Sequence, residues 1–280
     1  MNLKTQRRWS TTAGLAIVSV LVVVAVLAPW ISPHDPAVVD PAIALATAST
    51  DHWLGTDNLG RDVLSRLVWG ARLSLGIVLL AAMLIMSVGI AVGVLAGYVG
   101  GLLDDVLMRA ADAVLSVPTL LLALAIVGTT GPGLHSLVLG LASIWWVSHA
   151  RVVRGMVLSL RERGFVEAER ALGASDGRII ARCILPIVLP LAVVLASLEM
   201  GELILAISGL SFLGLGAQPP TAEWGAMLSD GRTFFSAAPR LMIYPGIVIS
   251  LSVLGFNLLG DGLRDALDPL DASRLKGFGA

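Results

Sequence analysis

Six long apolar runs dominate this sequence, and each is close to the length of a helix that crosses a lipid bilayer. They lie at residues 11–31, 73–97, 113–130, 134–150, 185–208 and 242–260. A spanning helix needs about 20 consecutive, mostly apolar residues. Peptide groups in hydrocarbon must form their hydrogen bonds inside the protein, so isolated runs of this kind can only be helices. The sequence therefore predicts an all-α, polytopic membrane protein with about six transmembrane helices.

The third and fourth runs are shorter than the others. The turn GTTGPG at residues 128–133 separates them. Glycine and proline in such a cluster mark a tight turn. We therefore expect a helical hairpin whose outer end does not cross the membrane fully.

Composition excludes several classes of protein. Of the 280 residues, 56% are hydrophobic and 14% are charged, whereas a soluble domain carries about 25% charged residues. The net charge of −1 gives no indication of nucleic-acid binding. Cys183 is the only cysteine, so neither an intrachain disulfide nor a cysteine-rich metal site is possible. A membrane location is the remaining interpretation.

Motifs of enzymes are missing from the sequence. A phosphate-binding loop reads G-x-x-x-x-G-K-[ST], and the only lysines, Lys4 and Lys276, stand in no such loop. The strings H-E-x-x-H and G-x-S-x-G are also absent. The sequence therefore predicts no catalytic residues, no cofactor in this chain, and no ATP hydrolysis by this route.

Positive charge is distributed unequally between the two sides of the membrane. With six spans both termini lie on one side, and a cytoplasmic N-terminus places 14 of the 19 Lys and Arg residues inside. Cytoplasmic loops carry such an excess. Both termini and residues 165–186 are thus predicted to be cytoplasmic. Cleavage of the first run as a signal peptide is the alternative; Lys4, Arg7 and Arg8 precede it, but Pro29 after Ala28 makes a poor cleavage site.

Residues 165–186, FVEAERALGASDGRIIARCILP, form a polar segment between two apolar runs. Phe165, Ala168 and Leu172 lie at helical spacing and give one apolar face. Gly173 is suited to end that helix. A plain basic loop that only fixes the topology is the alternative interpretation.

This segment resembles the cytoplasmic loop of the inner-membrane permease subunits of ABC importers. Their pattern is E-A-A, three residues, G, nine residues, I-x-L-P, and it is matched here by Glu167, Ala168, Gly173, Leu185 and Pro186. Glu169 replaces the second alanine and Cys183 replaces the isoleucine. The resemblance implies a short coupling helix that docks on an ATPase subunit, through residues that include Leu172.

Further strings resemble the dipeptide/oligopeptide/nickel branch of these permeases. They are WLGTD at 53–57 with GRD at 60–62, SFLGLG at 211–216 with EWG at 223–225, and GDGLRD at 260–265. The first external segment, 33–72, begins as a loop and becomes amphipathic from Asp57 onward. An interfacial helix lying on the membrane is expected there.

The resemblance implies that the transporter is assembled from several chains. Its partners would be a second homologous permease subunit, two ATPase subunits that carry ATP and Mg²⁺, and an external solute-binding protein, all at a bacterial inner membrane. Peptides are the expected solutes, and nickel or another metal chelate is the alternative. A stand-alone secondary transporter is a rival from another class, but such proteins often show internal repeats, and none is found here.

Two carboxylates interrupt the fifth apolar run. Glu199 and Glu202 stand three residues apart, on one helix face. Charged groups inside a membrane are costly and usually face a bundle interior or a watery path. Together with Ser208 they are candidates for the translocation pathway of a cationic or amine-bearing solute. The alternative is a structural role, in which they hold helices together.

Other polar residues have simpler interpretations. Asp104, Asp105, Arg109 and Asp112 have the spacing of a local ion-pair network at a helix end, with a second ATPase contact as the alternative. The four histidines, His34, His52, His135 and His149, show no spacing of metal ligands, so no metal site is predicted.

These interpretations divide the chain into three parts. Residues 1–72 comprise the N-terminal arm, the first span and the external segment. Residues 73–260 form the transmembrane permease domain, with the coupling segment at 165–186. Residues 261–280 are expected to form a cytoplasmic tail.

Overall fold

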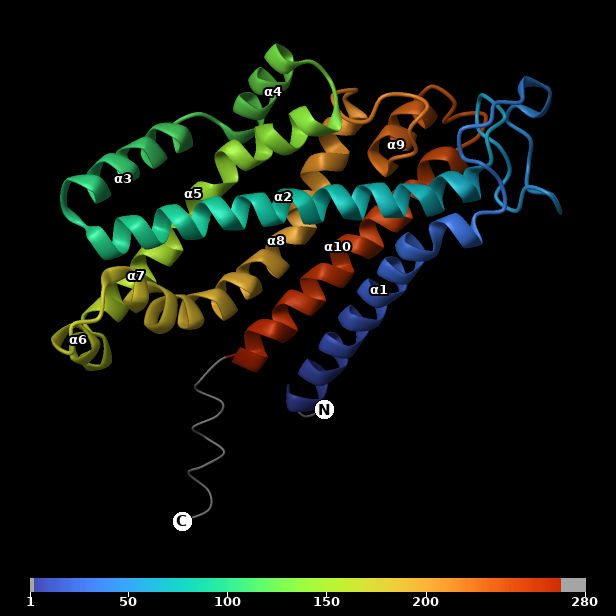
Figure 1. Ribbon diagram of the computed structural model, residues 1–280. Coiled ribbons are helices and arrows are strands. Elements are labelled where there is room, and N and C mark those ends of the chain that lie inside the picture. The colour runs from blue at the N-terminus through green and yellow to red at the C-terminus, as the bar shows by residue number, and fades with distance from the viewer. Residues whose placement is uncertain (1–2, 268–280) are drawn as a thin grey trace.

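The computed structural model describes residues 3–267, and helices make up most of this part of the chain (Figure 1). The α-helices are α1 (Leu3–Ile31), α2 (Val63–Val99), α3 (Gly101–Leu115), α4 (Thr119–Thr130), α5 (Leu134–Arg161), α6 (Gly164–Ala171), α7 (Asp176–Ile179), α8 (Leu185–Phe212), α9 (Trp224–Arg232) and α10 (Arg240–Leu267). A 3-10 turn, η1 (Pro41–Ile43), and a π-helical turn, η2 (Ile180–Ile184), complete the set. The described residues contain no strand beyond an isolated bridge between Thr56 and Asp62. The all-α prediction is confirmed.

Five described helical stretches are long and apolar enough to cross a membrane. They are Trp9–Ile31, Val63–Val99, Leu134–Arg161, Asp176–Phe212 and Arg240–Asp265. A sixth span is obtained if α3 and α4, which meet at an angle of 88°, are counted as one. The structure thus agrees with the expectation of about six spans.

The third predicted span differs from the others. α4 has 12 residues, which at 1.5 Å per residue reach about 18 Å, less than the ~30 Å hydrocarbon core. The break with α3 falls just before Pro118, because a residue that precedes proline is disfavoured in the helical conformation. The expected short hairpin is present as α4 and α5, and α4 alone cannot cross.

The pairing of α2 with α5 is the most extensive helix contact (Figure 1). Gly89, Gly93 and Gly97 recur every four residues on α2. A Cβ at these positions would lie 2.5 Å from His149 Cβ, 2.6 Å from Ala150 O and 2.8 Å from Val157 Cβ, respectively. Small residues at such a contact let two membrane helices approach closely. The glycine ridge therefore sets the distance between α2 and α5.

The remaining long helices lie beside this pair. α10 packs against both α1 and α8, and α1 also contacts α2. Val20, Val23 and Val26 of α1 are exposed although they are apolar. Such a surface is stable in lipid and costly in water. The outer face of α1 therefore fits a membrane environment.

The polar segments gather at two opposite ends of the bundle (Figure 1). Residues 33–62 and α9 lie at one end. The segment containing α6 and α7 lies at the other, as do the first turns of α1 and the last turns of α10. This is the separation expected of the external and cytoplasmic segments. The expected tail lies outside the described residues from position 268 onward.

The expected surface helix after the first span is not a separate element. Residues 63–72 are the first turns of the 37-residue α2. Asp62 caps this helix by accepting a hydrogen bond from Ser65 N. Arg61 and Arg66, which belong to the polar face of this amphipathic segment, are buried. The prediction was wrong because Asp57, from the preceding loop, and Asp230, from α9, enclose these arginines.

The glycine ridge leads to a test of stability. We expect Gly93→Val to destabilise the fold by about 1–3 kcal/mol, because the added atoms would overlap α5. Gly76→Val is the matched control, since nothing lies within 4 Å of a Cβ at this α2 position. The apparent melting temperature in detergent measures both. Equal melting temperatures for the two variants would contradict the role of the ridge.

Candidate coupling and translocation sites

The short helix α6 is fixed to the bundle by one side chain. Val166 is fully buried and belongs to a small hydrophobic cluster. The other buried members come from α2, α5, α7, η2 and α8: Val94, Val153, Val157, Ile179, Ile184 and Val188. The sequence pattern missed Val166, because it stands between residues that face outward. Its burial holds α6 against the ends of three long helices.

The apolar face predicted for this segment points away from its own chain. Phe165 is 45% exposed and Leu172 is 84% exposed, and Ala168 is exposed between them. Glu167, in the first turn of α6, is exposed as well. Exposed leucine and phenylalanine at the tip of a polar segment leave apolar area that this chain does not cover. The face is therefore available to another protein.

Gly173 ends the helical turn after α6 in a left-handed conformation, with φ of +83°. An added Cβ would meet nothing within 4 Å. Backbone strain, and not lack of space, is therefore what disfavours other residues there. Pro186 lies in the first turn of α8, where its missing N–H is tolerated.

Polar contacts tie the coupling segment and the end of α5 to α2. Tyr98 Oη donates a hydrogen bond to Asp176 Oδ1 over 2.7 Å. Arg161 donates to the carbonyl of Gly97 over 3.0 Å. Tyr98 and Gly97 belong to the last turn of α2, whereas Asp176 belongs to α7 and Arg161 ends α5. These contacts join α7 and the end of α5 to α2.

The charges of α3 pair with α5 and not with one another. Arg154 donates to both carboxylate oxygens of Asp104, over 2.5 and 2.6 Å. Asp112 pairs with Arg151. The ion pairs found in the described residues do not include Arg109, so the expected network within one helix is wrong. The facing helix supplies arginines whose partners could not be read from local spacing.

Glu199 and Glu202 line a hollow of about 310 Å³ between α8, α5 and the break between α3 and α4. The lining residues are Leu115, Thr119, Leu120, Ile144, Trp145, Ser148, Glu199 and Glu202. The opposite side of α8 packs closely on α10, since a Cβ at Gly201 would lie 2.6 Å from Asn257 Oδ1. The helix therefore directs the two glutamates into the hollow.

Ser208 is placed differently from the glutamates. It is buried, and a Cβ at Gly225 of α9 would lie 2.4 Å from the Ser208 carbonyl oxygen. It is not among the residues that line the hollow. Its backbone instead forms the contact between α8 and α9.

A histidine from α5 joins Glu199. His149 is buried, and its Nε2 lies 3.1 Å from Glu199 Oε2. The two atoms are close enough for an ion pair, but their directions do not satisfy hydrogen-bond geometry. His149 Nδ1 lies 3.3 Å from the carbonyl oxygen of Trp145. Fifty positions separate His149 from Glu199 along the chain, so no spacing rule could find this pair.

The strings at 53–57, 60–62 and 223–225 contribute to a buried polar core. Arg61 and Arg66 both contact Asp57 Oδ2, at 2.6 and 3.4 Å. Both also reach Asp230 Oδ2 from α9, at 3.2 and 3.5 Å. Glu223 is buried at the start of α9, where it accepts from the backbone N–H groups of residues 225 and 226. These residues therefore join the external segment to α9.

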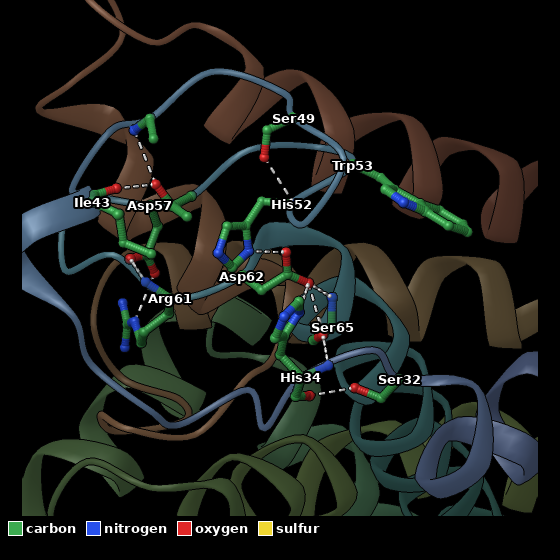
Figure 2. A network of polar contacts seen from close by, with 12 residues as sticks. Ser32, His34, Ile43, Ser49, His52, Trp53, Asp57, Arg61, Asp62 and Ser65 are labelled. Atoms are coloured by element: carbon green, nitrogen blue, oxygen red, sulfur yellow. Dashed lines mark hydrogen bonds and ion pairs between the residues drawn. The ribbon is translucent and has the colours of Figure 1, made fainter.

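His34, His52 and Asp62 meet at the first turn of α2 (Figure 2). Burial alone would raise the pKa of Asp62, but hydrogen bonds from Ser65 and His52 outweigh it and lower that pKa. The spacing of these residues along the chain did not indicate that they would come together. They lie outside the hollow and the coupling segment.

Two family models match this chain. Residues 89–270 match the family described as "Binding-protein-dependent transport system inner membrane component". Residues 7–48 match the "N-terminal TM domain of oligopeptide transport permease C".

Several curated relatives match along nearly the whole chain. The nickel transport system permease protein NikC of Escherichia coli is 42% identical, over 96% of this chain and 97% of its own length. The dipeptide transport system permease protein DppC of Alkalihalophilus pseudofirmus is 44% identical, over 91% and 84%. The glutathione transport system permease protein GsiD of Pectobacterium atrosepticum is 42% identical, over 93% and 86%.

A solved structure shares the fold. In an inward-facing crystal form of the MetNI methionine ABC transporter, one chain superimposes with a TM-score of 0.57 and 22% identity. The match covers 73% of this chain and 97% of that one. At this identity the likeness concerns the arrangement of helices alone.

Proposed function

Because the chain belongs to the family of binding-protein-dependent transport system inner membrane components, we propose that it forms half of a pore for peptides. It is a permease subunit of an ABC importer, in the branch of nickel, dipeptide and glutathione permeases. The other half is a second homologous permease. Two ATPase subunits at the cytoplasmic end and an external solute-binding protein complete the assembly. ATP and Mg²⁺ bind to the ATPases, and this chain makes and breaks no covalent bond.

The exposed apolar face of α6 is the observation that carries this proposal. Phe165, Ala168 and Leu172 stand within the matched motif and face away from the bundle. An ATPase groove that covers them would remove this area from water at about 25 cal/mol per Å². Glu167 and Gly173 shape the contact, Glu167 by its charge and Gly173 by its backbone conformation. Pro186 lies in the first turn of α8, which leads from the coupling segment into the membrane.

Transport follows from differential binding of nucleotide to two states of the assembly. ATP favours the closed ATPase dimer, and a ligand shifts an equilibrium only by its difference in affinity for the two states. α6 moves with the ATPase that holds it. Val166 and the Tyr98–Asp176 hydrogen bond pass this movement to α2, α5 and α8. The pore then changes between inward-facing and outward-facing forms.

The hollow beside Glu199 and Glu202 is the proposed translocation pathway. Two carboxylates that share one hollow attract a cationic group, such as the ammonium of a peptide. Trp145 and Leu120 offer apolar surface for the side chains of the peptide. Ser208, which was a candidate from the sequence, serves the packing of α9 and lies outside this pathway.

Nickel or a nickel chelate is the second candidate solute. His149 and Glu199 place an imidazole nitrogen 3.1 Å from a carboxylate oxygen, and imidazole is a preferred ligand of nickel. The 42% identity with a nickel permease is compatible with this solute, and the identities with peptide permeases are as high. The hollow, at about 310 Å³, has more volume than a single ion needs. We therefore retain a peptide as the main proposal.

Both termini are proposed to be cytoplasmic, in a bacterial inner membrane. In a Cys183→Ser background, a cysteine introduced at the exposed position Ala48 should react with an impermeant thiol reagent in intact cells. A cysteine at Ser175, also exposed in the isolated chain, should react only after the cells are lysed. The reverse pattern would invert the topology and remove the proposed ATPase contact.

The coupling assignment is tested by three variants of the exposed face. Leu172→Asp and Glu167→Lys should each reduce uptake at least tenfold. The first places a charge in an apolar contact with the ATPase, and the second reverses a charge beside it. Gly173→Ala should also impair uptake, whereas Gly173→Asn is the matched control, since asparagine tolerates a left-handed backbone more readily.

Membrane insertion and recovery of the ATPases are measured on the same preparations. The variants should insert normally but retain less ATPase on purification. Normal recovery of active ATPase with Leu172→Asp would contradict the docking of α6.

The pathway is tested by Glu199→Gln and Glu202→Gln, which keep size and hydrogen bonding but remove charge. We expect uptake to fall at least tenfold for each, while the loaded binding protein still stimulates ATP hydrolysis. Labelled dipeptide and labelled nickel are compared as solutes, so the uptake that is lost identifies the cargo. Unchanged uptake in the double variant would assign both glutamates a structural role.

A further inference from the structure

The external segment brings together three donor groups that the proposed transport function does not use. His34 follows α1, His52 lies in the loop between η1 and α2, and Asp62 caps α2 (Figure 2). One ligand atom from each of these residues lies within 4.8 Å of the other two. Three segments of chain thus converge at one point on the external end of the bundle.

The carboxylate of Asp62 is at the centre of this group. His52 Nδ1 lies 2.9 Å from Asp62 Oδ1, and His34 Nδ1 lies 3.9 Å from Asp62 Oδ2. The two imidazole rings lie side by side, with centroids 4.6 Å apart and planes inclined by 32°. Both Nδ1 atoms therefore lie near one carboxylate, and Figure 2 shows the two rings beside it.

Neighbouring serines hold these groups in place. Ser65 donates to Asp62 Oδ2 from both its backbone N and its Oγ, each over 2.7 Å. The same Oγ accepts from the backbone N of His34 over 3.0 Å. Ser49 Oγ accepts from the backbone N of His52 over 3.0 Å. These bonds fix the Asp62 carboxylate and the backbone of both histidines.

Burial leaves the group fixed at its base and open on its outer side. The Asp62 side chain is 2% exposed, whereas that of His34 is 40% exposed. A preformed carboxylate with a solvent-accessible imidazole provides both a rigid ligand and a path of entry.

We propose that His34, His52 and Asp62 bind one divalent late first-row transition metal ion, such as Zn²⁺, at the external face. Two imidazoles and one carboxylate are donors for this class of ion, whereas Mg²⁺ and Ca²⁺ require oxygen ligands. Water completes the coordination. The ion clamps the end of α1, the external loop and the start of α2 to one another.

This proposal is independent of the transported solute and of the pathway through α8. Binding is therefore measured without the binding protein or ATP, on the assembled importer purified in detergent. We expect one Zn²⁺ per copy of this chain, with no competition from a large excess of Mg²⁺. Co²⁺ in the same site should give the visible absorption of a protein-bound ion.

Single substitutions separate metal binding from structure. His34→Gln and His52→Gln should each lower the affinity for Zn²⁺ at least tenfold. Asp62→Asn should do the same and still cap α2, since asparagine is an equally good N-cap residue. His135→Gln is the matched control, because His135 is exposed and lies outside the group.

Hydrogen exchange tests whether the bound ion holds the three segments together. Hydrogen exchange of residues 33–62 should slow when Zn²⁺ is added to the unmodified protein and should not change in His34→Gln. Unchanged affinity in the two histidine variants, or an equal loss in His135→Gln, would overturn the proposal. The absence of any bound Zn²⁺ at tens of micromolar would do so as well and would leave Asp62 as a helix cap alone.

Discussion

The close approach of α2 and α5 is the contact on which the rest of the structure depends. Gly89, Gly93 and Gly97 allow it, because a Cβ at these positions would overlap α5. Water does not drive helices together inside lipid, so close packing must do so. α2 then continues from residues 33–62 at its first turn and contacts the segment 165–186 near its last turn. The hollow with the two glutamates opens beside α5 because α5 is held in this position.

Polar groups in this chain are stabilised by partners from distant segments. Arg61 and Arg66 share the nearby Asp57 and the distant Asp230 of α9. Asp104 is paired with Arg154 across two helices. A buried charge without a partner is strongly destabilising, so these pairs determine how the segments fit together. Glu199 and Glu202 are different, because they face a hollow and only Glu199 meets a histidine.

The coupling segment combines firm attachment with an uncovered surface. Val166 and the Tyr98–Asp176 hydrogen bond attach it to the bundle, and Phe165 and Leu172 remain outside. The proposed ATPase contact requires both, because the surface would hold the ATPase and the attachment would pass its movement to the bundle. The short helix has both because its two faces differ. The clamp proposed for His34, His52 and Asp62 would stiffen the opposite end of α2.

The sequence by itself determined the helical class, the long spans, the family motif and the apolar face of α6. These features follow from residues close together in the chain, where hydrophobic length and helical period are decisive. Only the tertiary structure decided that residues 63–72 continue into α2, that Arg61 and Arg66 are buried, and that Asp104 pairs with Arg154. It also brought His149 to Glu199, and His34 and His52 to Asp62. Contacts of this kind join residues far apart in the chain, and their partners are set by helix packing, which no local spacing records.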